Sequence, residues 1–322
     1  MRRLRISAIS YLNTAPLMWD FDHGEAAKDF DIFYSVPSSC AAALREGTGD
    51  IGIIPAIAYN SIPGLVIIPE VAIAAHGPVR SILLISKVPL EQVRTIATDN
   101  SSMTSVALTR VLFEKWWGGG RQFRSLPPDL AAMLRECDAG LIIGDPALKV
   151  DRSRYQVYDL AEEWKRLSGK SFVFAFWAVR EAGLAEMRPG LDLAAVFQAS
   201  RDHGLRPAAL EQIAQEWSAR LQITAAEVKE YLTRNIYYRL DQDCLEGMQL
   251  FFQYAGECGA VEQLRPVTFL EPAAAPGAVL SLSDVSAPCA RVEDRVSPLS
   301  VNFQLMMLRA APARGPSIRV PR

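Results

Sequence analysis

The chain has 322 residues, of which 50% are hydrophobic and 22% charged, and its formal net charge is −2. This is the composition of a globular protein with a sizeable core and about two domains of ordinary size, so it excludes a wholly disordered chain. The near-neutral charge provides no basic stripe, and neither nucleic acid nor an anionic membrane is implied as a partner.

The cysteines and the N-terminal segment indicate the compartment. Five cysteines are scattered, with no C-x-x-C pair and no nearby histidine, so neither a disulfide framework nor a zinc site is predicted. The first residues imitate a signal peptide, but polar residues interrupt the apolar stretch and no small-residue cleavage site precedes Asp20. No run of about 18 apolar residues predicts a membrane span. We therefore expect a cytoplasmic protein that needs no metal and no cofactor.

Short apolar segments alternate with helix-period segments, which predicts an α/β fold with mostly parallel sheets. From about Gly190 the apolar spacing becomes helical throughout, as in Leu210, Ile213 and Trp217, so a helical segment is expected to close the folded part. Residues 271–322 are rich in Ala, Pro, Ser and Arg, which predicts a disordered tail. The expected strands are Leu4–Ser10, Ile32–Val36, Asp50–Ile54, Ser81–Ser86, Thr95–Thr98, Ala139–Ile143 and Phe172–Val179.

Two of these strands divide the chain into lobes. Ser81–Ser86 and Phe172–Val179 flank a compact α/β block, which predicts one lobe inserted into another and a two-strand hinge. We assign residues 1–87 and 172–270 to a discontinuous first lobe and residues 88–171 to a second, inserted lobe. A ligand is then expected in the cleft between the lobes.

Three polar turns each follow an apolar segment and open a helix-period segment. They contain Asn13, the Pro37–Ser39 turn and the segment Asn100–Ser105. Helix N-termini present free N–H groups and the positive end of the helix dipole, so they favour carboxylates. Three such ends in one cleft predict a small ligand with several negative charges. The alternative is that these polar side chains only cap their helices.

A set of motifs in fixed order runs from Leu4 to Gln253. The motifs are Ser10-Tyr11-Leu12-Asn13, Pro37-Ser38 with Leu44, Gly47 and Asp50, Gly77-Pro78-Val79-x-Ser81, Ser102-x-Thr104-Ser105, Ile143-Gly144-Asp145-x-Ala147-Leu148, Tyr158-Asp159-Leu160-x-x-x-Trp164 and Asn235-Ile236-x-Tyr238-x-Leu240. This set resembles the chorismate dehydratase family, which opens the futalosine route to menaquinone. The resemblance implies a two-lobed fold like that of the type II periplasmic binding proteins.

The resemblance also implies a reaction, the loss of water from chorismate to give 3-[(1-carboxyvinyl)oxy]benzoate. Removal of the acidic C–H pushes negative charge onto the ring carboxylate, and preorganised neutral donors can stabilise that charge. We expect Asn13 to be the catalytic donor. The residues expected to bind the substrate are Ser10, Tyr11, Ser38, Ser81, Ser102, Thr104, Ser105, Gly144 and Asp145.

A protein base is missing from the motifs, because the matching pocket segments carry no His, Glu or Lys. The family is thought to use the substrate's own enolpyruvyl carboxylate, and an effective molarity on the order of 10⁵ M makes such a base sufficient. Asp145 precedes Pro146, so it is either a helix cap or a proton donor to the departing hydroxyl. An aromatic side chain of the strand Phe172–Val179 could wall the substrate ring.

A second class of function stays open, since fold does not fix function. A non-catalytic solute-binding or ligand-sensing protein could use the same two-lobed fold for a small carboxylate. Transport predicts a cleavable signal or a lipidation cysteine, and a transcriptional sensor predicts a helix-turn-helix; neither pattern is visible. No G-x-G-x-x-G or Walker pattern predicts a nucleotide. The oligomeric state is not predicted.

Overall fold

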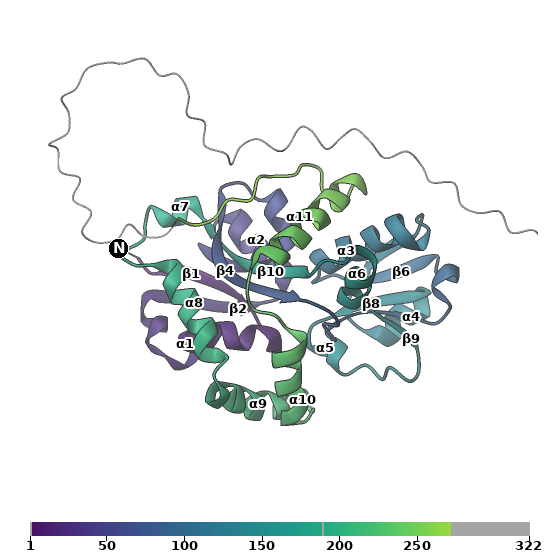
Figure 1. Ribbon diagram of the computed structural model, residues 1–322, viewed down its shortest axis with the longest axis horizontal. Coiled ribbons are helices and arrows are strands. Elements are labelled where there is room, and N and C mark those ends of the chain that lie inside the picture. The colour runs from purple at the N-terminus through teal and green to yellow at the C-terminus, as the bar shows by residue number, and fades with distance from the viewer. Residues whose placement is uncertain (1, 189, 272–322) are drawn as a thin grey trace, which may run out of the picture. The chain divides into compact units, whose positions relative to one another are not determined.

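Two five-stranded sheets carry the fold (Figure 1). The computed structural model describes residues 2–188 and 190–271. The first sheet has the order β2-β1-β3-β10-β4, and its strands are β1 (Leu4–Ile9), β2 (Phe30–Ser35), β3 (Ile51–Pro55), β4 (Leu65–Ala75) and β10 (Phe172–Arg180). The second sheet has the order β7-β6-β8-β5-β9, and its strands are β5 (Ile82–Ser86), β6 (Thr95–Asp99), β7 (Gln122–Leu126), β8 (Ala139–Ile143) and β9 (Gln156–Asp159).

Both sheets have the same topology. In the first sheet β1 runs parallel to β2 and β3, whereas β10 runs antiparallel to β3 and β4. In the second sheet β6 runs parallel to β7 and β8, whereas β5 runs antiparallel to β8 and β9. The sheets are therefore mixed rather than mostly parallel. Because β10 enters the first sheet only after β9, the second sheet is inserted between two parts of the first.

The connection between the sheets differs from the expected two-strand hinge. The strands β5 and β10 do not pair with each other, because β5 lies between β8 and β9 in the second sheet and β10 lies between β3 and β4 in the first. The chain passes from one sheet to the other over residues 76–81 and 160–171. The expected boundary after residue 87 thus falls behind a strand of the second sheet. An apolar central strand has the same sequence signature as a buried hinge strand.

The seven predicted strands are all present, and three further strands were missed by the sequence patterns. The missed strands β4, β7 and β9 all lie at sheet edges. In β7 and β9 exposed polar residues, among them Gln122 and Gln156, interrupt the apolar pattern. In β4 the interruption is Pro69-Glu70, where Glu70 has a φ of 63°.

The helices cover the sheets and connect their strands. The predicted helical segment after Gly190 is confirmed by the last four of them. The α-helices are α1 (Trp19–His23), α2 (Pro37–Glu46), α3 (Thr104–Leu112), α4 (Leu130–Glu136), α5 (Asp145–Leu148), α6 (Leu160–Ser168), α7 (Glu181–Leu184), α8 (Leu193–Gly204), α9 (Pro207–Leu221), α10 (Ala225–Glu230) and α11 (Gln242–Glu257). A 3₁₀ helix spans Leu12–Met18, and a π-helical turn spans Tyr231–Asn235.

An aromatic cluster ties the last helix to the junction of the two sheets. Trp164 of α6 packs edge to face against Phe172 of β10 and Phe251 of α11, with ring centroids 5.4 and 6.1 Å apart. The indole N–H of Trp164 donates to the carbonyl of Ser171 at 3.2 Å. Aromatic pairs of this kind stabilise by about 0.5–1.5 kcal/mol beyond their buried area. The cluster holds the second crossing segment, residues 160–171, against the first sheet.

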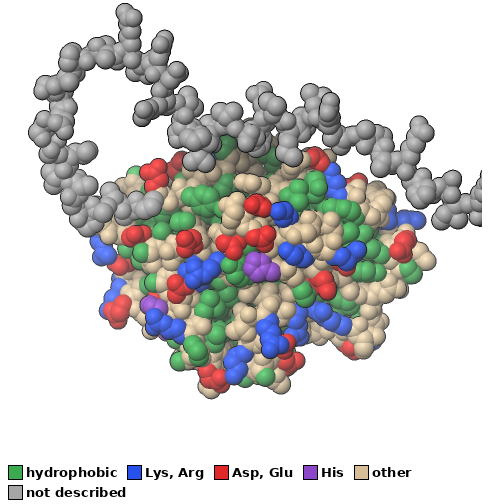
Figure 2. Space-filling model, in the orientation of Figure 1, with side chains coloured by type: hydrophobic (Ala, Val, Ile, Leu, Met, Phe, Trp, Pro, Cys, Tyr) green, Lys and Arg blue, Asp and Glu red, His purple; other side chains and the backbone are tan. Residues whose placement is uncertain are grey.

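Charged side chains of both signs mix over the face shown in Figure 2, and no large area of one sign forms there. Within residues 2–188 and 190–271, no helix has the length and apolarity needed to cross a membrane. The predicted disordered tail lies outside the described residues from residue 272 onward.

Candidate active site

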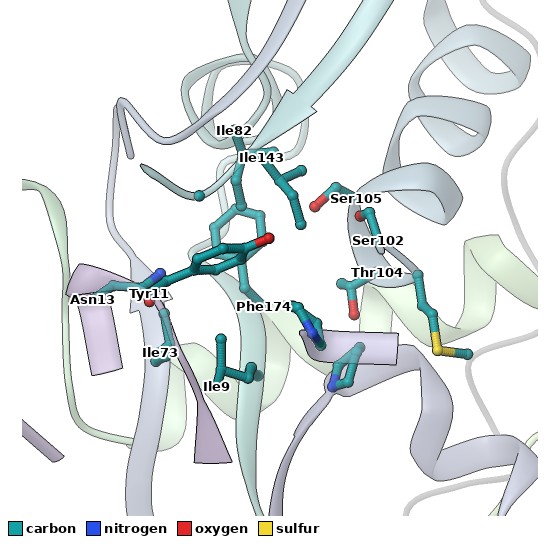
Figure 3. Close-up of a pocket in the computed structure, with 15 residues that line it drawn as sticks. Ile9, Tyr11, Asn13, Ile73, Ile82, Ser102, Thr104, Ser105, Ile143 and Phe174 are labelled. Atoms are coloured by element: carbon teal, nitrogen blue, oxygen red, sulfur yellow. The ribbon is translucent and has the colours of Figure 1, made fainter. Parts of the chain in front are cut away.

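A small pocket lies among strand ends of both sheets and the start of α3 (Figure 3). Its volume is about 50 Å³. Ligand sites usually enclose about 300–1,000 Å³, so the walls must move apart to admit a ligand. None of the lining side chains carries a formal charge. The lining residues are Ile9, Tyr11, Asn13, Pro37, Pro55, Ile73, Ile82, Ser102, Met103, Thr104, Ser105, Ile143, Gly144, Phe174 and Ala175.

Neutral hydrogen-bonding groups reach this pocket from two directions. Asn13 and Tyr11 lie on one side of it, and Ser102, Thr104 and Ser105 lie on the other, at the start of α3 (Figure 3). The Oδ1 atom of Asn13 accepts from the neighbouring threonine hydroxyl at 3.3 Å, and no hydrogen bond within the described residues occupies its amide as a helix cap. Hydroxyl and amide groups can donate to a ligand oxygen without adding charge.

The helices that begin at the pocket have no side-chain caps. The N-cap residues of α2 and α3 are Val36 and Met103, and neither provides a side-chain hydrogen bond. The 3₁₀ helix that contains Asn13 also starts without one. First-turn N–H groups of uncapped helices remain able to bind an anion. The capping alternative is therefore wrong for Asn13, Ser38, Ser102, Thr104 and Ser105.

Tyr11 bridges the two sheets across the pocket. Its ring packs on Gly144, where a Cβ atom would lie 2.7 Å from the ring carbons, and Gly144 also has a φ of 64°. Only glycine satisfies both conditions at this position. The Tyr11 hydroxyl lies 3.4 Å from the Ser101 Oγ, which donates to Asp99 Oδ1 at 2.6 Å. Burial raises the pKa of the Tyr11 phenol, so it stays protonated and neutral.

Residues 4–257 match the sequence model of a family described as menaquinone biosynthesis. The chain belongs to this family. A curated chorismate dehydratase from Thermus thermophilus is 26% identical over 274 residues, which cover 80% of this chain and 96% of that protein. The resemblance drawn from the sequence motifs is thereby confirmed.

Solved structures share the fold of this family member. The aliphatic sulphonate binding protein SsuA from Escherichia coli has a TM-score of 0.57 at 17% identity and covers 92% of this chain and 97% of its own. A ligand-binding component of an ABC-type import system from Staphylococcus aureus has a TM-score of 0.58 at 11% identity, covering 84% and 97%. The predicted periplasmic-binding-protein-like α/β fold is confirmed.

A second, larger cleft adjoins the pocket in this menaquinone-biosynthesis protein. It has a volume of about 460 Å³ and shares Ile9 and Tyr11 with the pocket. Unlike the pocket, it is lined by charged side chains, among them Asp22, Glu216 and Arg220. The Arg220 guanidinium lies 4.3 Å from the Trp217 ring centroid. Tyr11 is thus the wall between a neutral pocket and a charged cleft.

Asp145 has a role that the sequence did not predict. It is the first residue of α5, whose N-cap is Gly144, and its carboxylate caps no backbone group of that helix. Instead, Oδ1 accepts from the backbone N–H of Leu12 at 2.9 Å, at the start of the 3₁₀ helix beside the first sheet. Burial raises the pKa of Asp145 to about 6, and the charge of Arg220 acts in the opposite direction. The carboxylate therefore links the second sheet to the Asn13 segment.

The expected site residues divide into two groups. Six of them line the pocket: Tyr11, Asn13, Ser102, Thr104, Ser105 and Gly144. Ser10 lines the charged cleft instead, and the Ser38 backbone N–H donates to the Ser101 carbonyl at 3.1 Å. Ser81 is fully buried behind the lining residue Ile82. Substrate contacts by these residues stay predictions.

One aromatic residue near the site was expected from the sequence, and another, Tyr231, was missed. Phe174 of β10 lines the pocket, which fits the expectation that one aromatic residue of this strand walls the ring. Tyr231 hydrogen-bonds Ser81 and was not identified. Its only signal in the sequence is its position four residues before the Asn235 motif, and a long-range contact leaves no local pattern. Among the described residues, no group of three His, Cys, Asp or Glu side chains could hold a metal ion.

Proposed function

We propose that this chain is a chorismate dehydratase, which converts chorismate to 3-[(1-carboxyvinyl)oxy]benzoate and water as the first step of futalosine-dependent menaquinone biosynthesis. The family match over residues 4–257 and the similarity to a chorismate dehydratase support the reaction. The observation that carries the mechanism is the uncharged pocket, whose polar groups are neutral donors and helix starts. The four cysteines of the described chain are free, which supports a reducing cytoplasm as the location.

The substrate brings the only charges into such a pocket. Chorismate has two carboxylates, and the start of α3, which no side chain caps, offers N–H groups for an anionic oxygen. The apolar walls, Ile73, Ile82 and Phe174, suit the face of the ring. These features support a site in which neutral donors hold two anionic groups and exclude competing charges.

The lack of a charged lining residue supports a substrate-assisted proton transfer. The enolpyruvyl carboxylate would remove the ring proton that is vinylogous to the ring carboxylate, and negative charge would move onto that carboxylate. The C–O bond to the ring hydroxyl then breaks, hydroxide leaves with the transferred proton as water, and the ring becomes aromatic. Asn13 is the proposed donor to the developing charge, and loss of such a donor typically costs about 10²–10³ in rate.

The direct test is incubation of the purified full chain with chorismate. We expect an aromatic product whose mass is lower than that of chorismate by one water, formed in proportion to protein concentration. An Asn13→Ala sample that melts at the parent temperature serves as the control. If chorismate raises the melting temperature but no product forms, a non-catalytic binding protein is favoured. The likeness of the fold to that of SsuA supports this second candidate.

A further inference from the structure

Tyr231 occupies a buried position directly behind the pocket wall. It belongs to the π-helical turn Tyr231–Asn235, and its side chain is fully buried. Its hydroxyl donates to the Ser81 Oγ at 2.8 Å. Ser81 is also buried and immediately precedes Ile82, which lines the pocket. The π-helical turn therefore holds the Ser81 side chain at the edge of the site, although Tyr231 and Ser81 are 150 residues apart in sequence.

Ser81 connects this bond to the pocket. Its carbonyl accepts from the N–H of Gly144 at 2.8 Å, and Gly144 supports the Tyr11 ring. A displacement of Ser81 would therefore move both Ile82 and Gly144. Buried hydrogen bonds of this kind fix one geometry, because an unmade bond in the interior is costly.

The backbone before Ser81 is held from a second side. The buried Asp159 carboxylate accepts from the N–H groups of Val79 and Arg80 at 3.1 and 2.6 Å. Arg80 has a φ of 62°, a conformation that side chains other than glycine rarely adopt. The Asn235 amide donates to the Pro78 carbonyl at 2.9 Å. The crossing segment 76–81 is thus clamped along its backbone, and Tyr231 fixes the hydroxyl at its end.

The Tyr231 phenol keeps its proton for this bond. Burial raises the pKa of Tyr231 well above its usual range, whereas the hydrogen bond to Ser81 acts in the opposite direction. The O–H therefore remains available to donate to Ser81 at ordinary pH.

We propose that Tyr231 is a positioning residue of the active site, which holds Ser81 and, through it, the positions of Ile82 and Gly144. The inference rests on the proposed chorismate dehydratase function. Tyr231 does not line the pocket, so it acts through the residues it orients.

The chain contains a matched control for this proposal. Tyr238 lies seven residues further on and is 3% exposed, against 2% for Tyr231. Its hydroxyl has no hydrogen-bond partner within the described residues. Tyr231→Phe and Tyr238→Phe therefore remove the same atom from equally buried rings, but only the first removes a bond to the site.

The test is the steady-state kinetics of both variants with chorismate, together with their melting temperatures. We expect Tyr231→Phe to lower kcat about tenfold with KM changed less than threefold, and Tyr238→Phe to leave both parameters near the parent values. In a Ser81→Ala background, Tyr231→Phe should cause no further loss, because the bond is already absent. If Tyr231→Phe does not fold, Ser81→Ala alone should show the same kcat loss.

Three kinetic results would overturn the proposal while leaving the proposed function intact. A Tyr231→Phe kcat within twofold of the parent would show that the hydroxyl orients nothing important. Equal kcat losses in the two phenylalanine variants would indicate a general packing effect. Full additivity of Tyr231→Phe and Ser81→Ala would show that Tyr231 does not act through Ser81. Absence of product from the parent protein would contradict the proposed function itself, and this inference with it.

Discussion

The neutral pocket and the charged cleft share Ile9 and Tyr11 but differ in chemistry. The pocket has about 50 Å³ and no charged lining residue, whereas the cleft has about 460 Å³ and carries charges of both signs. In the cleft the Arg220 guanidinium and the carboxylates of Asp22 and Glu216 line the same space. The pocket has no charged lining side chain, so any charge inside it must come with the ligand. The difference supports the proposal that the pocket takes a ligand that supplies its own charges.

The largest expected effect comes from the amide of the pocket. Asn13→Ala should leave the protein folded but lower turnover by about 10²-fold or more, because a neutral charge-stabilising donor is lost. Asn100→Ala, at an exposed turn before α3, is the control and should keep parent activity. Steady-state kinetics with chorismate measures both. A folded Asn13→Ala variant with near-parent turnover would remove Asn13 from the site.

The next effect tests the wall between the two regions. Gly144→Ala would place a methyl group 2.7 Å from the Tyr11 ring and force a φ of 64° on alanine. We expect about a tenfold loss in kcat/KM, because Tyr11 must move away from its packing position. Gly120→Ala also places alanine at a positive φ, of 67°, but meets no atom within 4 Å, so it is a control without the contact to a ring. Equal activities in the two variants would show that the Tyr11 contact is unimportant.

A smaller effect separates residues inside the pocket from those beside it. Ser105 lines the pocket, whereas Ser38 does not. From the sequence alone both are expected to bind substrate. Ser105→Ala should raise KM several-fold with little change in kcat, as expected for loss of a uniform binding contact. An unchanged KM for Ser105→Ala, or an equal rise for Ser38→Ala, would contradict the pocket boundary.

The smallest effect concerns the stability contributed by Asp145. Its folded-state pKa of about 6 lies above the ordinary 3.8. Between about pH 4 and pH 6 the folded protein therefore binds more protons than the unfolded chain, and the free energy of unfolding falls as pH rises through this window. Asp145→Asn removes the ionisation and keeps an oxygen for the Leu12 N–H. The variant should gain on the order of 1 kcal/mol over the parent between pH 4 and pH 8.

Denaturant unfolding at both pH values measures this gain. Asp151→Asn is the control, because that carboxylate is exposed and its pKa is lowered by Ser153 rather than raised. The kinetics of Asp145→Asn are informative as well, since substantial activity is expected if the carboxylate only holds the Leu12 backbone. A gain that does not depend on pH, or a folded but inactive variant, would contradict this role.

The sequence predicted central features of the fold better than its edges. The apolar strands β1, β3, β8 and β10 are buried on both faces, so their composition alone identifies them. The edge strand β7 has the sequence Gln-Phe-Arg-Ser-Leu, and its Gln, Arg and Ser side chains are exposed. Such a polar sequence is also typical of a loop. The hinge was misplaced for a related reason, since an apolar strand does not reveal which sheet it joins.

The site shows the same division between local and long-range information. The polar turns before α2 and α3 follow from residue types and spacing, and the turn before α3 predicted Ser102, Thr104 and Ser105 of the pocket. The contact of Tyr11 with Gly144 and the bond from Tyr231 to Ser81 join residues more than 130 apart. Such contacts depend on how the two sheets meet. The Asp145 carboxylate is an example, because its partner lies not in its own helix but at Leu12.

The central claim is that the substrate supplies the base in a pocket that has none. A chorismate analogue whose enolpyruvyl carboxylate is replaced by a neutral amide tests it most directly, with binding and product formation measured on the same parent protein. The analogue should bind in competition with chorismate and yield no aromatic product, because an intramolecular carboxylate is the expected base. Efficient dehydration of the amide, together with a folded but inactive Asp145→Asn variant, would contradict the account and make Asp145 the general base.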